Sequence, residues 1–174
     1  MTTTLEALAT RLQKLEDLEA IRHTWRDYCK CLDSEDWRGL ADIFVVDGIL
    51  EMVGLNSLVA DIDGFYRGRD DIIQRFYQPA VASAANLGQG LFATGHLSTN
   101  MQIDVAGNEA TTLAYFFEIV ANNTVLIGTY QHRLQRDAER WRFKFLRISV
   151  RYHAELSAAQ VGGQSLQDIL ARPF

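Results

Sequence analysis

The chain has 174 residues, of which 48% are hydrophobic and 22% are charged, and its formal net charge is −5. This size and composition are typical of one globular domain with a sizeable core. The acidic balance and the scattered Lys and Arg argue against a nucleic-acid partner, and no apolar run approaches the roughly 20 residues of a membrane helix.

The first half of the chain has the pattern of helices. Apolar residues recur at alternating three- and four-residue steps over residues 15–32, which predicts an amphipathic helix. Ser34 is expected to cap a second helix that continues to Phe44. A short strand, an irregular segment and a third helix are expected next, over residues 49–53, 54–67 and 69–77.

The second half has the pattern of a sheet. Long alternating runs are separated by short turns that suit hairpins, which predicts four strands in an antiparallel meander, over residues 93–105, 109–121, 124–136 and 140–152. Helices followed by strands indicate an α+β fold, with the N-terminal helices packed into the hollow of a curved antiparallel sheet. A short C-terminal helix is expected at Leu166–Leu170, and residues 1–174 are expected to form a single domain.

One face of the strand over 93–105 is polar. His96 and Asn100 share that face, while Ile103 and Val105 lie on the other. Periodicity does not decide which face is the hollow one. His96 therefore either lines an enclosed volume or is a solvent-facing or structurally bonded histidine.

Charged residues also interrupt the later strands. Arg147 shares a face with Trp141, Phe143 and Phe145, so it is either partly buried beside an anionic partner or extends to the sheet edge. Glu118 similarly interrupts one face of residues 112–120, where it could pair with an arginine of the last strand.

Asp33 and Tyr28 lie near the end of the first helix. Each has a structural alternative, as a loop carboxylate and a core tyrosine respectively. On an ideal helix they are about 140° apart, so they share a pocket only if the helix end bends. The sequence has no metal-binding, nucleotide-binding or nucleophile-elbow motif, so we expect a site without metal or cofactor.

We expect a cytoplasmic location. The N-terminus lacks the basic segment and apolar core of a secretory signal. The two cysteines, Cys29 and Cys31, are spaced too closely for an ordinary disulfide on a helix, which favours reduced thiols.

Several segments resemble the SnoaL-like branch of the NTF2-like superfamily, and the likeness spans about residues 12–152. They are Leu15–Arg22, YCKCLDSEDW at Tyr28–Trp37, Tyr66–Ile72, Gly95–Asn100, Gly128–Leu134 and Trp141–Phe143. The resemblance implies a cone-shaped curved sheet closed by helices around a pocket for a small apolar ligand.

Within this branch the chain is most similar to scytalone dehydratase, gamma-hexachlorocyclohexane dehydrochlorinase and bile-acid 7-alpha-dehydratase, which are cofactor-free lyases. Carried over by position, the resemblance implies catalytic roles for Asp33, His96, Tyr28 and Arg147, although a gap-free match places the arginine at Leu146. The substrate-binding side chains that we expect are Trp25, Met52, Asn100, Phe117 and Tyr130.

Two departures argue against the scytalone reaction itself. Tyr115-Phe116-Phe117 stands where scytalone dehydratase has a second pocket histidine, and about Met52 stands where it has a substrate-polarising tyrosine. What the resemblance leaves is an Asp–His pair in an apolar pocket.

The resemblance therefore implies a cofactor-independent lyase of the dehydratase type, with an Asp–His pair as general base. Its substrate would be small and cyclic or polyketide-, aromatic- or steroid-like. An isomerase or cyclase would use the same base without a leaving group, and a non-catalytic small-ligand-binding module is the other alternative.

The resemblance also implies a homo-oligomer, either a trimer or a dimer, formed through the outer sheet face. If His96 faces inward, the candidate outer-face residues are Ile103, Val105, Leu113 and Leu146. The C-terminal tail ending in Phe174 is a candidate cover for the pocket mouth.

Overall fold

The computed structural model describes residues 4–85, 95–120 and 124–156. The helical segments are α1 (Leu5–Asp33), α2 (Trp37–Asp42), α3 (Arg69–Asp71), η1 (Ile72–Tyr77) and α4 (Gln78–Ala85). The strands are β1 (Phe44–Val53), β2 (Gly64–Arg67), β3 (Ser98–Ala106), β4 (Glu109–Val120), β5 (Thr124–Asp137) and β6 (Arg140–Glu155). The segment expected to be helical at Leu166–Leu170 and the tail to Phe174 lie outside the described residues.

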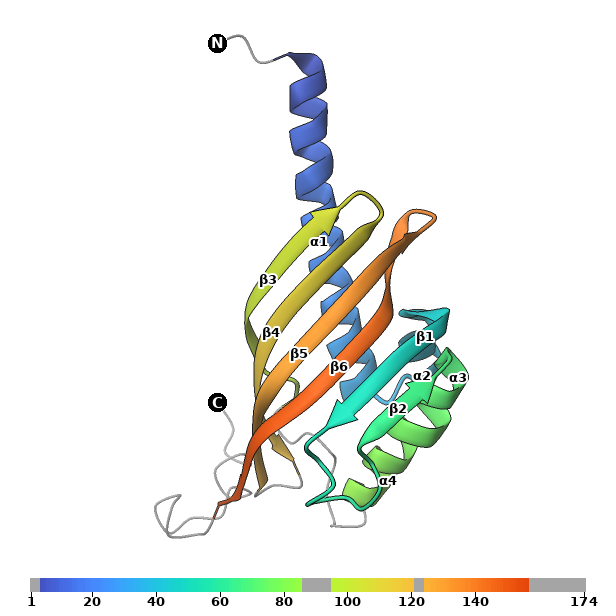
Figure 1. Cartoon of the computed structure of the whole chain (residues 1–174), viewed down its shortest axis with the longest axis vertical. Coiled ribbons are helices and arrows are strands. Elements are labelled where there is room, and N and C mark those ends of the chain that lie inside the picture. The colour runs from blue at the N-terminus through green and yellow to red at the C-terminus, as the bar shows by residue number, and fades with distance from the viewer. Residues whose placement is uncertain (1–3, 86–94, 121–123, 157–174) are drawn as a thin grey trace.

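The strands form one curved sheet in the order β2-β1-β6-β5-β4-β3, and α1 lies along one face of it (Figure 1). This arrangement confirms the predicted α+β fold and the antiparallel meander of the last four strands. The sheet is not antiparallel throughout, because β1 runs parallel to β6. The irregular segment contains β2, which pairs with β1 and extends the sheet by one short strand.

The boundary between the first two helices differs from the expectation. Asp36, rather than Ser34, caps α2: its Oδ1 accepts a hydrogen bond from the Gly39 amide at 2.9 Å. Ser34 instead ends α1, where its hydroxyl donates to the Lys30 carbonyl. Phe44 begins β1 and is fully buried in the core.

Two irregularities change which side chains face the hollow. In β3 the register shifts between Thr99 and Gln102, and Asn100 has a positive φ of 52°. As a result, Ile103 and Val105 pack against the core, although strict alternation from an inward His96 would send them outward.

A second register shift, opposite Arg133 and Leu134, breaks the alternation of β6. Phe143 and Leu146 both belong to the core, so Leu146 is not an outer-face residue. Of the four expected outer-face residues, Leu113 alone keeps that position, because it alternates in β4 with the buried Thr112 and Ala114.

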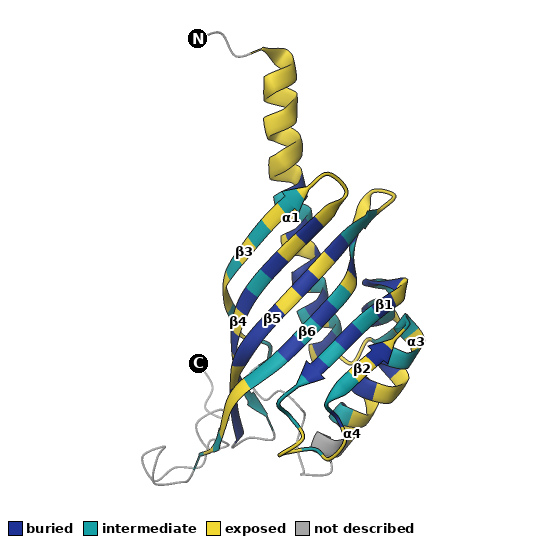
Figure 2. Cartoon of the chain, in the orientation of Figure 1, coloured by how far each residue is buried: buried dark blue, intermediate teal, exposed yellow. Residues whose placement is uncertain are grey.

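Helix α1 is longer than the predicted 15–32, and its two halves differ in surroundings. Residues 4–16 are exposed and extend beyond the sheet, whereas Ile21, Trp25, Tyr28 and Leu32 are buried against it (Figure 2). The predicted apolar stripe is thus confirmed from Ile21 onward, but Leu15 lies in the exposed half. Within the described part of the chain, no helix combines the length and the hydrophobicity needed to cross a membrane.

Candidate functional site

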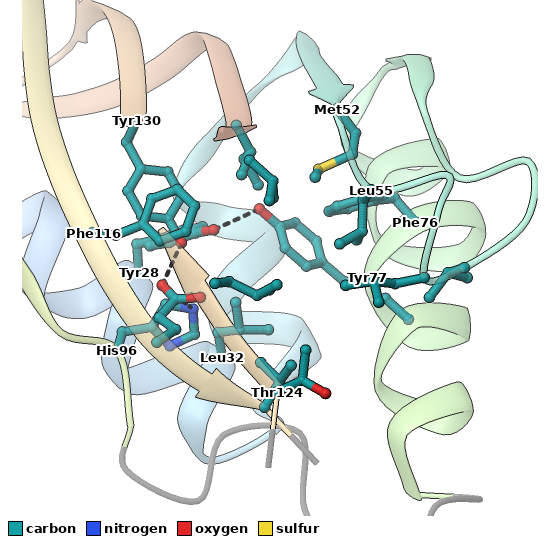
Figure 3. A pocket seen from close by; sticks show the side chains of 18 of the residues that line it. Tyr28, Leu32, Met52, Leu55, Phe76, Tyr77, His96, Phe116, Thr124 and Tyr130 are labelled. Atoms are coloured by element: carbon teal, nitrogen blue, oxygen red, sulfur yellow. Dashed lines mark hydrogen bonds and ion pairs between the residues drawn. The ribbon is translucent and has the colours of Figure 1, made fainter. Parts of the chain in front are cut away.

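The hollow of the sheet contains a cavity with a volume of about 520 Å³, which is in the usual range for a small-molecule site (Figure 3). Most of its wall is apolar, supplied by residues that include Leu32, Met52, Leu55, Phe76, Phe116, Leu126 and Ile148. Among the described residues that line it, no Lys or Arg is present, and the polar side chains are Tyr28, Tyr77, His96, Glu118, Thr124, Tyr130 and Glu155.

His96 lines this cavity and is bonded to Asp33. The His96 Nδ1 and Asp33 Oδ1 atoms are 2.6 Å apart, and the His96 amide donates to Asp33 Oδ2 at 3.3 Å. The imidazole is 1% exposed and the carboxylate 35%. Burial opposes ionisation of Asp33, but the hydrogen bonds from His96 outweigh it and lower the pKa of the carboxyl below its ordinary value. An ionised Asp33 accepts from Nδ1–H, so Nε2 is the basic nitrogen of the neutral ring.

The local backbone explains how two residues 63 positions apart reach each other. Asp33 is the last residue of α1, and Gly95 precedes the histidine with a positive φ of 70°. A Cβ atom at Gly95 would lie 3.1 Å from Asp33 Oδ2, so the glycine permits the close approach of this segment to the helix end. Tyr28 lies about one and a half turns before Asp33 on α1. Its ring meets the His96 ring edge-on, with the ring centroids 5.9 Å apart. Asp33 and Tyr28 therefore share His96 as a neighbour.

Glu118 supplies a second carboxyl group near the histidine. Its Oε1 is 4.0 Å from His96 Nε2 and accepts a hydrogen bond from the Tyr130 hydroxyl at 2.8 Å. Burial raises the pKa of Glu118 above its ordinary value, and the nearby Asp33 carboxylate adds to this, while His96 and Tyr130 act in the opposite direction. The two carboxyls beside His96 are therefore shifted in opposite directions.

Two tyrosine hydroxyls meet at another part of the wall. The Tyr28 and Tyr77 oxygens are 2.9 Å apart, and burial raises the pKa of both phenols, so both remain protonated and one donates to the other (Figure 3). Tyr77 ends η1, a π-helical segment that also places Phe76 on the cavity wall. Such segments widen the helical turn and change the direction of the side chains that follow.

Several predicted site residues occupy the expected positions. His96, Tyr28, Met52 and Tyr130 line the cavity, and Asp33 is directly behind the histidine. Trp25 does not line it: its ring stacks on Tyr28 at 4.9 Å, and its Nε1 donates to the Ser98 hydroxyl at 2.7 Å. Trp25 therefore supports the cavity wall from behind.

Three other residues were placed wrongly. Arg147 lies on the opposite face of β6 from the inward Leu146 and Ile148, with its guanidinium 3.3 Å from Glu51, because the β6 irregularity changes the alternation. Phe117 points outward, and Phe116 takes its expected place on the wall.

Asn100 is the third misplaced residue. It is exposed at the β3 bulge, and it does not line the cavity.

Two site residues were missed or misassigned. The partners of Glu118 are Tyr130 and His96 rather than an arginine, although its polarity on an inward strand face was a usable signal. Tyr77 had no such signal, since its position depends on the π-helical geometry of η1. Within the described part of the chain, no three His, Cys, Asp or Glu side chains are grouped to hold a metal ion.

Comparison with known families agrees with this architecture. The sequence pattern of the SnoaL-like domain matches residues 13–147. This chain belongs to the SnoaL-like family. A comparison with curated proteins gives no match.

Solved structures give the same fold. This SnoaL-like chain is similar to an NTF2-like protein with a cystatin-like fold from Novosphingobium aromaticivorans (21% identity, TM-score 0.62, covering 99% of this chain and 100% of that one). It is also similar to a scytalone dehydratase-like protein from the same organism (20% identity, TM-score 0.60, covering 83% of this chain and 90% of that one). A third similar structure is the hexachlorocyclohexane dehydrochlorinase LinA-type3 from Novosphingobium barchaimii LL02 (17% identity, TM-score 0.64, covering 84% of this chain and 94% of that one). At these identities the likeness establishes the fold.

Proposed function

We propose that this SnoaL-like protein is a cofactor-independent lyase of the dehydratase type, with His96 as general base. The observation that carries the proposal is the 2.6 Å contact between Asp33 and His96 at the wall of a largely apolar cavity. Asp33 holds the proton on Nδ1, so Nε2 can take a proton from a carbon next to a carbonyl group. The Asp33 carboxylate then stabilises the imidazolium that forms.

Glu118 is suited to the second half of the reaction. As the C–H electron pair forms the new double bond, a hydroxyl on the β carbon leaves and needs a proton. Burial raises the pKa of Glu118, which favours a protonated carboxyl that can supply that proton. The substrate loses one water molecule, and a proton returns from His96 to Glu118 or solvent to complete the cycle.

The cavity wall favours a neutral, compact substrate. A volume of about 520 Å³ accommodates one or a few fused rings, and the apolar wall favours their burial. In the Tyr28–Tyr77 pair, the hydroxyl that accepts the mutual bond keeps its own proton, which it can donate to a carbonyl oxygen as that oxygen gains enolate character. These features support a cyclic β-hydroxyketone of polyketide, aromatic or steroid type.

The test uses β-hydroxycyclohexanone and β-hydroxytetralone as probes. Mass spectrometry measures the loss of water, and NMR in deuterium oxide measures deuterium incorporation at the α carbon. We expect turnover by the wild type and a loss of about 10²–10⁴-fold in His96→Ala. The matched control is His23→Ala, since His23 is an exposed histidine on α1.

The outcomes separate the alternatives. Deuterium incorporation without loss of water would favour an isomerase or cyclase with the same base. Saturable binding of both probes without either reaction, or equal rates in His96→Ala, would contradict the lyase proposal and favour a ligand-binding module.

A further inference from the structure

The projecting half of α1 carries an apolar stripe that is exposed to solvent and lies outside the core formed by the described residues. Leu5, Leu8, Leu12 and Leu15 are 86%, 48%, 56% and 63% exposed. Their spacing of three, four and three residues is that of the a and d positions of a coiled-coil heptad. Figure 1 shows this half extending past the sheet, so none of the described strands lies against it.

This stripe is not a continuation of the buried stripe of α1. At about 100° per residue, the exposed leucines are centred roughly 150° from Ile21, Trp25 and Tyr28. The side of the helix opposite the leucines carries Thr10, Gln13 and Lys14, which suit solvent. The four leucines therefore form a separate apolar surface, directed away from the face that α1 presents to its own sheet.

We propose that this surface pairs with the same segment of a second copy of the chain, as a short parallel coiled coil over residues 5–18. If the leucines are a and d, Arg11 is at g and Glu16 at the e position of the next heptad. In a parallel pair, the g position of one helix lies beside the following e position of its partner. Arg11 of each copy therefore lies beside Glu16 of the other, which gives two ion pairs between the helices. An antiparallel pair would bring the two Arg11 side chains together instead.

The rest of the molecule is compatible with this pairing. Farther along the same helix face, the residues are charged: Glu19 pairs within the chain with Arg22 and Arg26, which ends the apolar seam. Because the sheet of each copy lies on the side of α1 away from the leucines, the two sheets would lie on the outer sides of the helix pair. The folded half of α1 also removes the nucleation cost that makes an isolated helix of this length marginal.

The first test measures the mass of the full chain by sedimentation equilibrium over a concentration series. We expect concentration-dependent pairing, and in the Leu8→Glu/Leu12→Glu variant at least tenfold weaker association. The control, Thr10→Glu/Gln13→Glu, adds the same charge on the opposite face and should associate like the wild type. Since all four positions are exposed, circular dichroism should show unchanged folding.

The second test addresses orientation. Arg11→Glu and Glu16→Arg should each weaken association, and the double variant should restore it, because the exchanged pair is again complementary. A monomeric wild type, or an assembly whose mass is the same in the leucine variant, would overturn the proposal. Failure of the double variant to recover would overturn the parallel arrangement. None of these measurements depends on the proposed lyase activity.

Discussion

Glu118 is the residue at which stability and chemistry conflict most directly. Its carboxyl is buried, and its pKa is raised above the ordinary value of 4.5. Below that pH the group is protonated in both the folded and unfolded states. As the pH rises, the unfolded state releases the proton first, so the fold loses about 1.4 kcal/mol for each unit by which the pKa is raised.

We therefore predict that Glu118→Gln is more stable than the wild type at neutral pH and yet less active. Gln fills the same space and cannot ionise, but it cannot donate the proton to a leaving hydroxyl. Activity on a β-hydroxyketone should fall by about 10²–10⁴-fold. In the wild type kcat should decline as the pH rises and Glu118 ionises, and this decline should be absent in the variant. Glu155→Gln, at the cavity rim, is the control. Full activity in Glu118→Gln would contradict the proton-donor role.

His132 makes a separate contribution to acid sensitivity. Its ring is stacked on Phe143 in the core and bonded to the Thr112 hydroxyl, and burial lowers its pKa from 6.5 to about 3. Above pH 6.5 neither state binds the proton, whereas between 6.5 and 3 only the unfolded state does. The free energy of unfolding should fall by about 1.4 kcal/mol per pH unit in this window.

Chemical denaturation across that window tests this prediction. His132→Leu should show a smaller loss of stability on acidification than the wild type, even if its stability at neutral pH is lower. Two parallel curves of unfolding free energy against pH would show that another group causes the acid sensitivity.

The residue scale also shows what the sequence could and could not predict. The Asp33–His96 contact was predicted from the family resemblance, whereas the sequence pattern alone left open a loop carboxylate and a solvent-facing histidine. The position of Arg147 was wrong because it depends on a register shift in β6 that alternation alone does not reveal. A single extra residue in a strand reverses every later side chain.

At the scale of elements, the β3 bulge allows the strand to serve both the site and the core. His96 and Ser98 face inward before it, and Ile103 and Val105 pack inward after it. Asn100 provides the positive φ of 52° that the irregularity needs, a conformation that Asn adopts more readily than most residues. The fold class and the meander followed from periodicity, but this bulge did not.

We predict that Asn100→Val destabilises the fold by about 1–3 kcal/mol, because a β-branched residue is strained at positive φ. Asn100→Gly should be close to neutral, since glycine adopts this conformation without strain. The exposed Gln102→Val, in the same strand, is the control for the change in side-chain type. Urea unfolding measures all three, and equal stabilities for Asn100→Val and Asn100→Gly would show that the bulge is not strained.

At the scale of the whole molecule, the cavity and the projecting half of α1 are separate parts. The cavity is lined by residues such as Thr124 and Ala80, at the end of the sheet near α4, whereas the exposed leucines extend past the opposite end (Figure 1). Pairing through α1 would therefore leave the cavity accessible. A helix was predicted over residues 15–32, but its extension back to Leu5 was not, and the separate exposed stripe requires knowing where the sheet ends.

The charge of the cavity predicts ligand selectivity. Glu155 lines it and Asp33 lies behind His96, while none of the described lining residues is Lys or Arg. A buried anion would have to leave water without a cationic partner, which is unfavourable. We predict that tetralone, a neutral bicyclic ketone, raises the Tm of the full chain and that naphthoate, a bicyclic carboxylate of similar size, does so at least tenfold more weakly in apparent affinity. Thermal unfolding with increasing ligand measures both.

In Val150→Arg, which adds a cation at the cavity wall, the preference should shift toward naphthoate. Equal stabilisation of the wild type by both compounds would contradict selection by charge.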